Sequence, residues 1–146
     1  MATLRIPVEM EPFLPYCRPA GSRRDIPKIF NTYADLVIFC AGYAFYRNGP
    51  KEPDLPKAFT KQTNPIDVQV FRSQGLFTVM MLIGIAATKG HEIANEEQRL
   101  VRLVEGFAKE GANLLFQEVS DSSPHDMTIE LAKRLSEALE DHGIKI

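Results

Sequence analysis

The sequence is poor in the residues that would indicate a secreted or membrane protein. It has no tryptophan, and its two cysteines, Cys17 and Cys40, are too few for a disulfide scaffold. The longest apolar run, 79–87, is much shorter than the roughly 20 residues that cross a bilayer. The first twelve residues include acidic residues and prolines, whereas a signal peptide needs an unbroken apolar stretch there. We therefore expect a cytoplasmic protein with reduced thiols.

The sequence also lacks the common catalytic and metal-binding motifs. It contains no CxxC, HExxH, GxxxxGK[ST] or GxSxG pattern. His91, His125 and His142 fall at separate expected helix boundaries, so they do not form a set of metal ligands. Cys17 is followed by arginines that would lower the pKa of its thiol if they were close in space. We expect no metal, no cofactor and no enzymatic activity. A small enzyme with a site built from His91, Cys17 or the central carboxylates is the least favoured alternative.

What is present is the composition of one globular domain. With 146 residues, 45% hydrophobic and 25% charged, the chain can bury one sizeable core, so a single domain 1–146 is expected. Its charge is uneven: residues 1–61 hold nine Lys and Arg against six Asp and Glu, whereas residues 62–146 hold eight against thirteen. Residues 1–30 are basic and rich in proline, and we interpret them as an arm on a helical core formed by 31–120.

Hydrophobic periodicity predicts a mainly α fold with about four to five helices. Helix 32–47 has an N-cap at Asn31 or Thr32 and a stop at 48–50. This helix and helix 76–88 are too apolar to face water, so we expect them to pack together as the centre of the core.

A capping box that begins at Asn95 predicts the start of a third helix, which continues to about residue 119. A fourth, amphipathic helix is predicted within 121–146. Gly106 and Gly111 destabilise the third helix intrinsically, so close backbone packing is their expected reason. Alternating apolar residues predict short extended segments at 4–8 and 66–71.

Helix 32–47 also predicts self-association. Apolar and aromatic residues lie on all its sides, more than one small core can cover, and a symmetric dimer is the common solution. We expect Phe39, Tyr43 and Tyr46 to form this interface.

The basic arm predicts contact with the DNA backbone. Its candidate residues are Arg5, Arg18, Arg23, Arg24 and Lys28. The Arg23–Arg24 pair lies in a Gly-, Ser- and Pro-flanked loop, where two guanidinium groups can bind neighbouring phosphates. The alternative is a solvated basic surface on a protein–protein adaptor or oligomeric scaffold. The two interpretations differ in whether the cations converge on one face.

Four blocks of sequence, 31–49, 65–71, 80–90 and 105–111, occur in an order and spacing that resemble one known family. This is the Dnd system-associated protein 4 family, also called DNA phosphorothioation-associated protein 4, and the resemblance covers roughly 3–120. It implies a bacterial accessory or regulatory protein encoded with anti-phage or restriction–modification machinery. Such machinery replaces a non-bridging phosphate oxygen of DNA by sulfur, or restricts unmodified DNA. Other proteins of that system are the implied partners.

The resemblance implies no catalytic residue. Its recognisable positions look architectural: Tyr33, Ala34, Asp35, Phe39, Gly49, Ile66, Phe71, Gly106 and Gly111.

Overall fold

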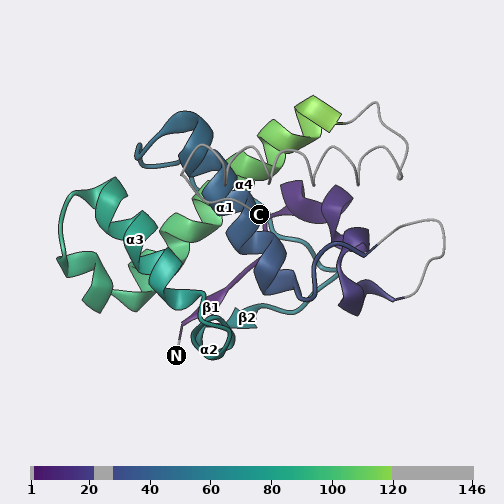
Figure 1. Ribbon diagram of the computed structural model, residues 1–146, viewed down its shortest axis with the longest axis horizontal. Coiled ribbons are helices and arrows are strands. Elements are labelled where there is room, and N and C mark those ends of the chain that lie inside the picture. Colours follow the sequence, from purple (N-terminus) through teal and green to yellow (C-terminus); the bar gives the residue numbers. More distant parts are fainter. Residues whose placement is uncertain (1, 22–27, 120–146) are drawn as a thin grey trace, which may run out of the picture.

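The computed structural model describes residues 2–21 and 28–119, which form a mainly α fold, as predicted (Figure 1). Its helices are α1 (Tyr33–Asn48), α2 (Val68–Ser73), α3 (Phe77–Thr88) and α4 (Glu97–Val119), with 3-10 helices η1 (Val8–Tyr16), η2 (Arg18–Ala20) and η3 (Glu92–Asn95). Strands β1 (Thr3–Leu4) and β2 (Ile66–Asp67) pair antiparallel, Thr3 opposite Asp67 and Leu4 opposite Ile66. The helix predicted within 121–146 lies outside the described residues. No helix in the described part is long and apolar enough to cross a membrane.

The ends of α1 follow from its sequence. The Thr32 hydroxyl accepts a hydrogen bond from the Asp35 backbone N–H at 3.1 Å, which satisfies a donor of the first turn. At the other end Gly49 adopts a φ of 77°, a conformation that glycine tolerates and other residues rarely adopt. The predicted helix 32–47 is therefore confirmed.

The centre of the core is α1 packed on α4, so the predicted central pair of 32–47 and 76–88 is wrong. Figure 1 shows α4 crossing α1, with α3 on one side of α4 and η1 on the other. Gly111 lies at this crossing, where an added Cβ would come within 1.8 Å of the Cys40 carbonyl oxygen. Gly106 packs in the same way on Pro53. Both glycines thus have the close-packing role expected of them.

Helix α3 differs from its predicted environment as well. Phe77, Met80 and Ile83 are buried, but Val79 is 38% and Leu82 62% exposed. One apolar side of this helix therefore faces solvent, contrary to the expectation that it is too apolar to do so. Hydropathy alone could not show this because α3 is apolar all round, and the core covers only one of its sides.

The two extended segments are shorter than predicted. In the segment 66–71 the strand is limited to Ile66–Asp67, because the Asp67 carboxylate accepts the Gln69 N–H and begins α2. The buried residues that follow, Val68 and Phe71, are three apart, which is helical spacing. At the N-terminus, η1 begins at Val8, directly after Pro7 forms a bridge to Phe59. The predicted helix start at Asn95 is also shifted: Asn95 is the last residue of η3, and α4 begins at Glu97.

Candidate nucleic-acid interface

Two chain segments, one before and one after residues 22–27, are held side by side. The Ile29 N–H donates to the Tyr16 carbonyl at 2.8 Å, and the Arg18 N–H donates to the Phe30 carbonyl at 2.9 Å. Arg18 and Lys28 are therefore brought to the same end of the molecule. Arg23 and Arg24 lie outside the described residues, in the chain that joins these two segments.

Each cation has one side-chain hydrogen bond to a described residue. Arg18 is exposed, and its Nε donates to Asn31 Oδ1 at 2.8 Å. Lys28 is half-buried, and its Nζ donates to the Pro15 carbonyl at 2.6 Å. A guanidinium has five N–H donors and an ammonium three, so each group can also bind an anion.

Lys28 also lines a hollow of about 330 Å³. Its other lining residues are Leu14, Pro15, Pro19, Ala20, Tyr33 and Gln62. Lys61, which is exposed, directly precedes Gln62. We call Arg18, Lys28 and Lys61 the basic end.

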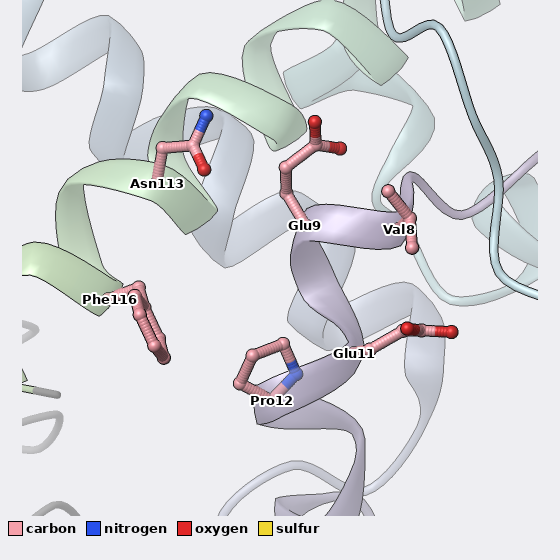
Figure 2. Close-up of a pocket in the computed structure, with 6 residues that line it drawn as sticks. All are labelled: Val8, Glu9, Glu11, Pro12, Asn113 and Phe116. Atoms are coloured by element: carbon pink, nitrogen blue, oxygen red, sulfur yellow. The ribbon is translucent and has the colours of Figure 1, made fainter.

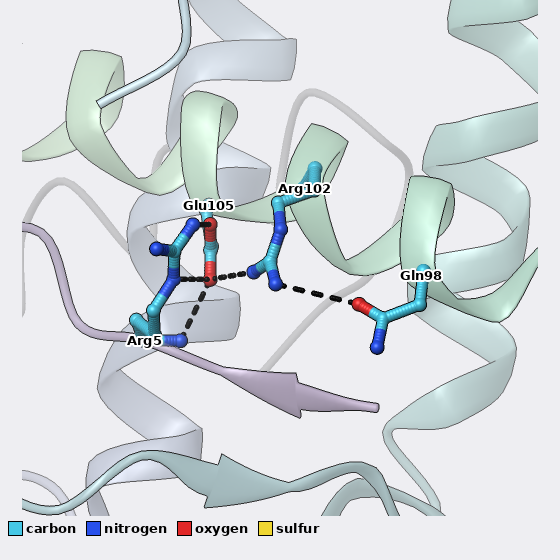
Figure 3. A network of polar contacts seen from close by, with 4 residues as sticks. All are labelled: Arg5, Gln98, Arg102 and Glu105. Atoms are coloured by element: carbon cyan, nitrogen blue, oxygen red, sulfur yellow. Dashed lines mark hydrogen bonds and ion pairs between the residues drawn. The ribbon is translucent and has the colours of Figure 1, made fainter. Parts of the chain in front are cut away.

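Arg5, which was predicted to contact the DNA backbone, is bound to Glu105 of α4 (Figure 3). Its backbone N–H donates to Glu105 Oε2 at 2.7 Å, and its Nη2 pairs with Glu105 Oε1 at 3.3 Å. Its guanidinium carbon lies 3.8 Å from the centre of the Phe59 ring. Arg102 also pairs with Glu105 Oε2 at 2.7 Å and donates to Gln98. Arg5 thus fastens the N-terminal segment to α4 and is not part of the basic end.

Glu105 is the important residue that the sequence interpretation missed. Its side chain is 1% exposed, although it carries a charge that both arginines contact. The signal was available in the sequence: Glu105 follows Val101 by four residues and precedes Ala108 by three, so it falls on the apolar stripe of α4.

The predicted interface residues form an aromatic row along α1. The centroids of Phe39 and Tyr43 are 6.3 Å apart, and those of Tyr43 and Tyr46 are 6.4 Å apart. Tyr43 is only 4% exposed, and its hydroxyl donates to Glu118, while Arg47 contacts both groups. Burial raises the pKa of the Tyr43 phenol, and Glu118 raises it further. Phe39 and Tyr46 are half-buried, so this row offers little free apolar surface.

The two thiols are buried, and neither has the environment of a nucleophile. Burial raises the pKa of Cys17 to about 12; the Lys28 charge opposes this and the Asp35 charge adds to it. Burial also raises the pKa of Cys40. Because the reactive form is the thiolate, burial disfavours a nucleophilic role for either thiol. Among the described residues, no three His, Cys, Asp or Glu side chains are grouped to hold a metal ion.

A second hollow of about 460 Å³ lies between η1 and α4 (Figure 2). Phe116 and Pro12 face each other across it. Glu9 and Glu11 also line it, and Glu9 Oε1 is buried without a hydrogen-bond partner among the described groups. These carboxylates would repel phosphates, so this hollow is unsuited to a nucleic-acid backbone.

Comparison with known proteins identifies the family. The family model of DNA sulphur modification system-associated protein 4 matches residues 22–144, which is most of the chain. The chain belongs to this family. It matches none of the curated proteins and none of the solved structures compared with it.

The match to the DNA sulphur modification system-associated protein 4 family covers a different range from the predicted one. The resemblance was expected over roughly 3–120, whereas the match begins at residue 22 and continues to 144. The C-terminal segment that was not placed in the family is therefore part of it. Arg23, Arg24 and Lys28 lie within the matched range, and Arg5 and Arg18 precede it. The family name associates the chain with a DNA sulphur modification system.

Proposed function

We propose that this protein is a cytoplasmic, non-enzymatic accessory or regulatory protein that binds the DNA backbone within a phosphorothioation-linked defence system. The observation that carries the proposal is the pairing of Tyr16 and Arg18 with Ile29 and Phe30. It supports the proposal because it holds the segments that carry Arg18 and Lys28 side by side. Arg23 and Arg24 follow Arg18 and precede Lys28 in the sequence.

The charge distribution supports weak and oriented binding. The whole chain has a formal net charge of −2, and Glu9 and Glu11 line the hollow at α4. Only a local basic surface can therefore face DNA. Phosphate contacts position a protein on the duplex and carry no sequence information, so affinity should be similar for all sequences.

The salt dependence of binding tests this proposal. If about four phosphates are neutralised, the logarithm of the affinity should fall with the logarithm of salt concentration at a slope near −3.6. Reversing both charges in Arg23→Glu/Arg24→Glu should flatten that slope by about two units and weaken binding to every duplex alike. The measurement is a fluorescence-anisotropy titration of a labelled duplex at several salt concentrations. Absence of any binding at low salt, or an unchanged slope in the double variant, refutes the DNA role.

A second candidate function is that of a protein–protein adaptor, and α3 is the observation that favours it. Val79 and Leu82 expose apolar surface on a helix that has no charged residue between Phe77 and Thr88. Such a surface is typical of protein contact sites. The contact is with a second copy of the chain or with another protein of the system, and it would use α3 in place of the aromatic row of α1.

Self-association through α3 has a direct test. The wild-type chain, 16.4 kDa as a monomer, should give about twice that mass by light scattering at tens of micromolar. Leu82→Glu should give the monomer mass, because the interface would bury an unpaired charge. Gln69→Glu adds the same charge at an exposed position of α2 and should remain dimeric. A monomeric wild type, or a dimeric Leu82→Glu, excludes this interface.

A further inference from the structure

We infer that the hollow between η1 and α4 receives an arginine side chain of a protein partner (Figure 2). The inference goes beyond the proposed function and does not depend on it, since it requires neither DNA nor the basic end. It also concerns a different surface from α3, because η1 and α3 lie on opposite sides of α4. It adds an interaction surface and the chemistry of its partner.

Exposed apolar side chains gather at this hollow. Val8 is 36% and Phe116 45% exposed, and both line it. Pro12 is exposed as well and faces Phe116 across the hollow (Figure 2). Exposed apolar side chains that meet at one concave surface are typical of contact sites. The hollow therefore offers apolar contacts to the methylene groups of a long side chain.

Two carboxylates lie among these apolar groups without a cation. Glu9 and Glu11 line the hollow, and neither forms an ion pair with a described residue. Glu11 Oε2 accepts the Thr60 hydroxyl at 2.6 Å, which holds this charge at the edge of the hollow. Glu9 Oε1 is buried, and it has no hydrogen-bond donor in the described part of the chain. A buried carboxylate oxygen without a donor is costly, so a donor that reaches Glu9 is favoured.

An arginine side chain combines the properties that these residues require. Its guanidinium carries a positive charge and five N–H donors, which can bind the Glu9 carboxylate and the side-chain carbonyl of Asn113. The planar group also stacks on aromatic rings, and Phe116 supplies one. The methylene stem can lie against Pro12. Lysine has the charge but lacks the planar face, and arginine is the cation enriched in protein interfaces.

The shape of the hollow suits a protein partner better than a free small molecule. It is a surface hollow of about 460 Å³ that is open to solvent. Sites for small molecules enclose most of the surface of their ligand. A protein partner instead covers the opening itself, and the loss of water strengthens the charge pair beneath it. The partner therefore has an arginine that projects from its surface.

Two blocked peptides test the inference: acetyl-Gly-Ser-Arg-Ser-Gly-amide, and the same peptide with citrulline, the neutral analogue of arginine, at its centre. Each is titrated into the isotope-labelled full chain and followed by amide NMR spectra. The arginine peptide should shift the signals of Asn113 and Phe116 with a Kd of about 1 mM, and the citrulline peptide should bind about fivefold more weakly. Glu9→Gln should weaken binding of the arginine peptide by about the same factor. Glu92→Gln removes the same charge at an exposed position of η3 and should bind like the wild type.

The outcomes distinguish this inference from the DNA role, which is measured in separate titrations. Absence of any shift at about ten times the expected Kd, equal binding of the two peptides, or unchanged binding by Glu9→Gln overturns the inference. Asn113 signals that move on dilution of the protein alone would assign the hollow to a second copy. Asn113 signals that move in Lys133→Gln/Arg134→Gln without peptide would assign it to residues of the same chain. Either result also overturns the assignment to a partner, and none of them affects the DNA role.

Discussion

Replacing Gly111 by alanine is expected to lower the free energy of unfolding by about 3 kcal/mol or more, which is a large part of the stability of a small domain. The added Cβ would lie 1.8 Å from the carbonyl oxygen of Cys40 and 2.6 Å from its carbonyl carbon. These are backbone atoms within α1, so no side-chain rotation can relieve the overlap. The two central helices would have to separate.

Two other glycines provide matched comparisons in urea unfolding. Gly42→Ala should stabilise the protein by about 0.5–1 kcal/mol, since Gly42 is in the interior of α1 and has no neighbour within 4 Å of an added Cβ. Gly106→Ala should be intermediate, because its nearest contact, 2.7 Å away, is to the side chain of Pro53. A Gly111→Ala variant as stable as the wild type would show that α1 and α4 do not cross at this point.

The second large effect is expected where Glu105 lies buried between two arginines. Arg5→Met/Arg102→Met should lower the free energy of unfolding by about 3–5 kcal/mol, because it leaves a buried carboxylate without a cation. Among the described residues, the Arg5 backbone N–H would then be the one remaining donor to Glu105. Equilibrium unfolding in urea measures the loss.

The triple variant Arg5→Met/Arg102→Met/Glu105→Met is the control for this network. It removes the stranded charge together with its partners, and replacing a whole buried ion pair by apolar residues is often nearly neutral. We therefore expect the triple variant to be more stable than the double variant. If the double variant were the more stable of the two, Glu105 would not be the buried, paired charge described here.

Local features of the fold could be predicted because they depend on neighbouring residues. The Thr32 cap, the Gly49 stop and the apolar face of α4 are all set within one or two turns of helix. Gly106 and Gly111 were recognised as packing positions because their helical penalty needed a reason. The partner of Gly111, the Cys40 backbone, could not be predicted from the sequence.

Features that depend on contacts distant in the chain were missed. Arg5 and Glu105 are separated by 100 residues, so Arg5 looked like a free surface cation. The apolar character of α1 and α3 indicated that they pack together, but α4, with its polar side, is the main partner of α1. Leu82 is exposed for the same reason: hydropathy does not say which side of an apolar helix the core covers.

The candidate site combines a prediction from charge with contacts that the structure adds. Arg18 and Lys28 were chosen for their charge, and the structure brings them to one end of the molecule through hydrogen bonds between Tyr16 and Ile29 and between Arg18 and Phe30. The hollow could not be predicted, because Gln62 reaches it from a segment about forty residues further along the chain than η2.

The most direct test of the account compares two charge reversals of equal size. Arg18→Glu/Lys28→Glu alters the basic end, whereas Lys51→Glu/Arg99→Glu alters residues near Glu52, beyond the C-terminal end of α1. Both change the net charge by the same amount, and circular dichroism checks that both are folded. In anisotropy titrations of one duplex at low salt, the first variant should lose binding and the second should remain close to wild type. Equal loss in both, or none in the first, would contradict a DNA interface at the basic end.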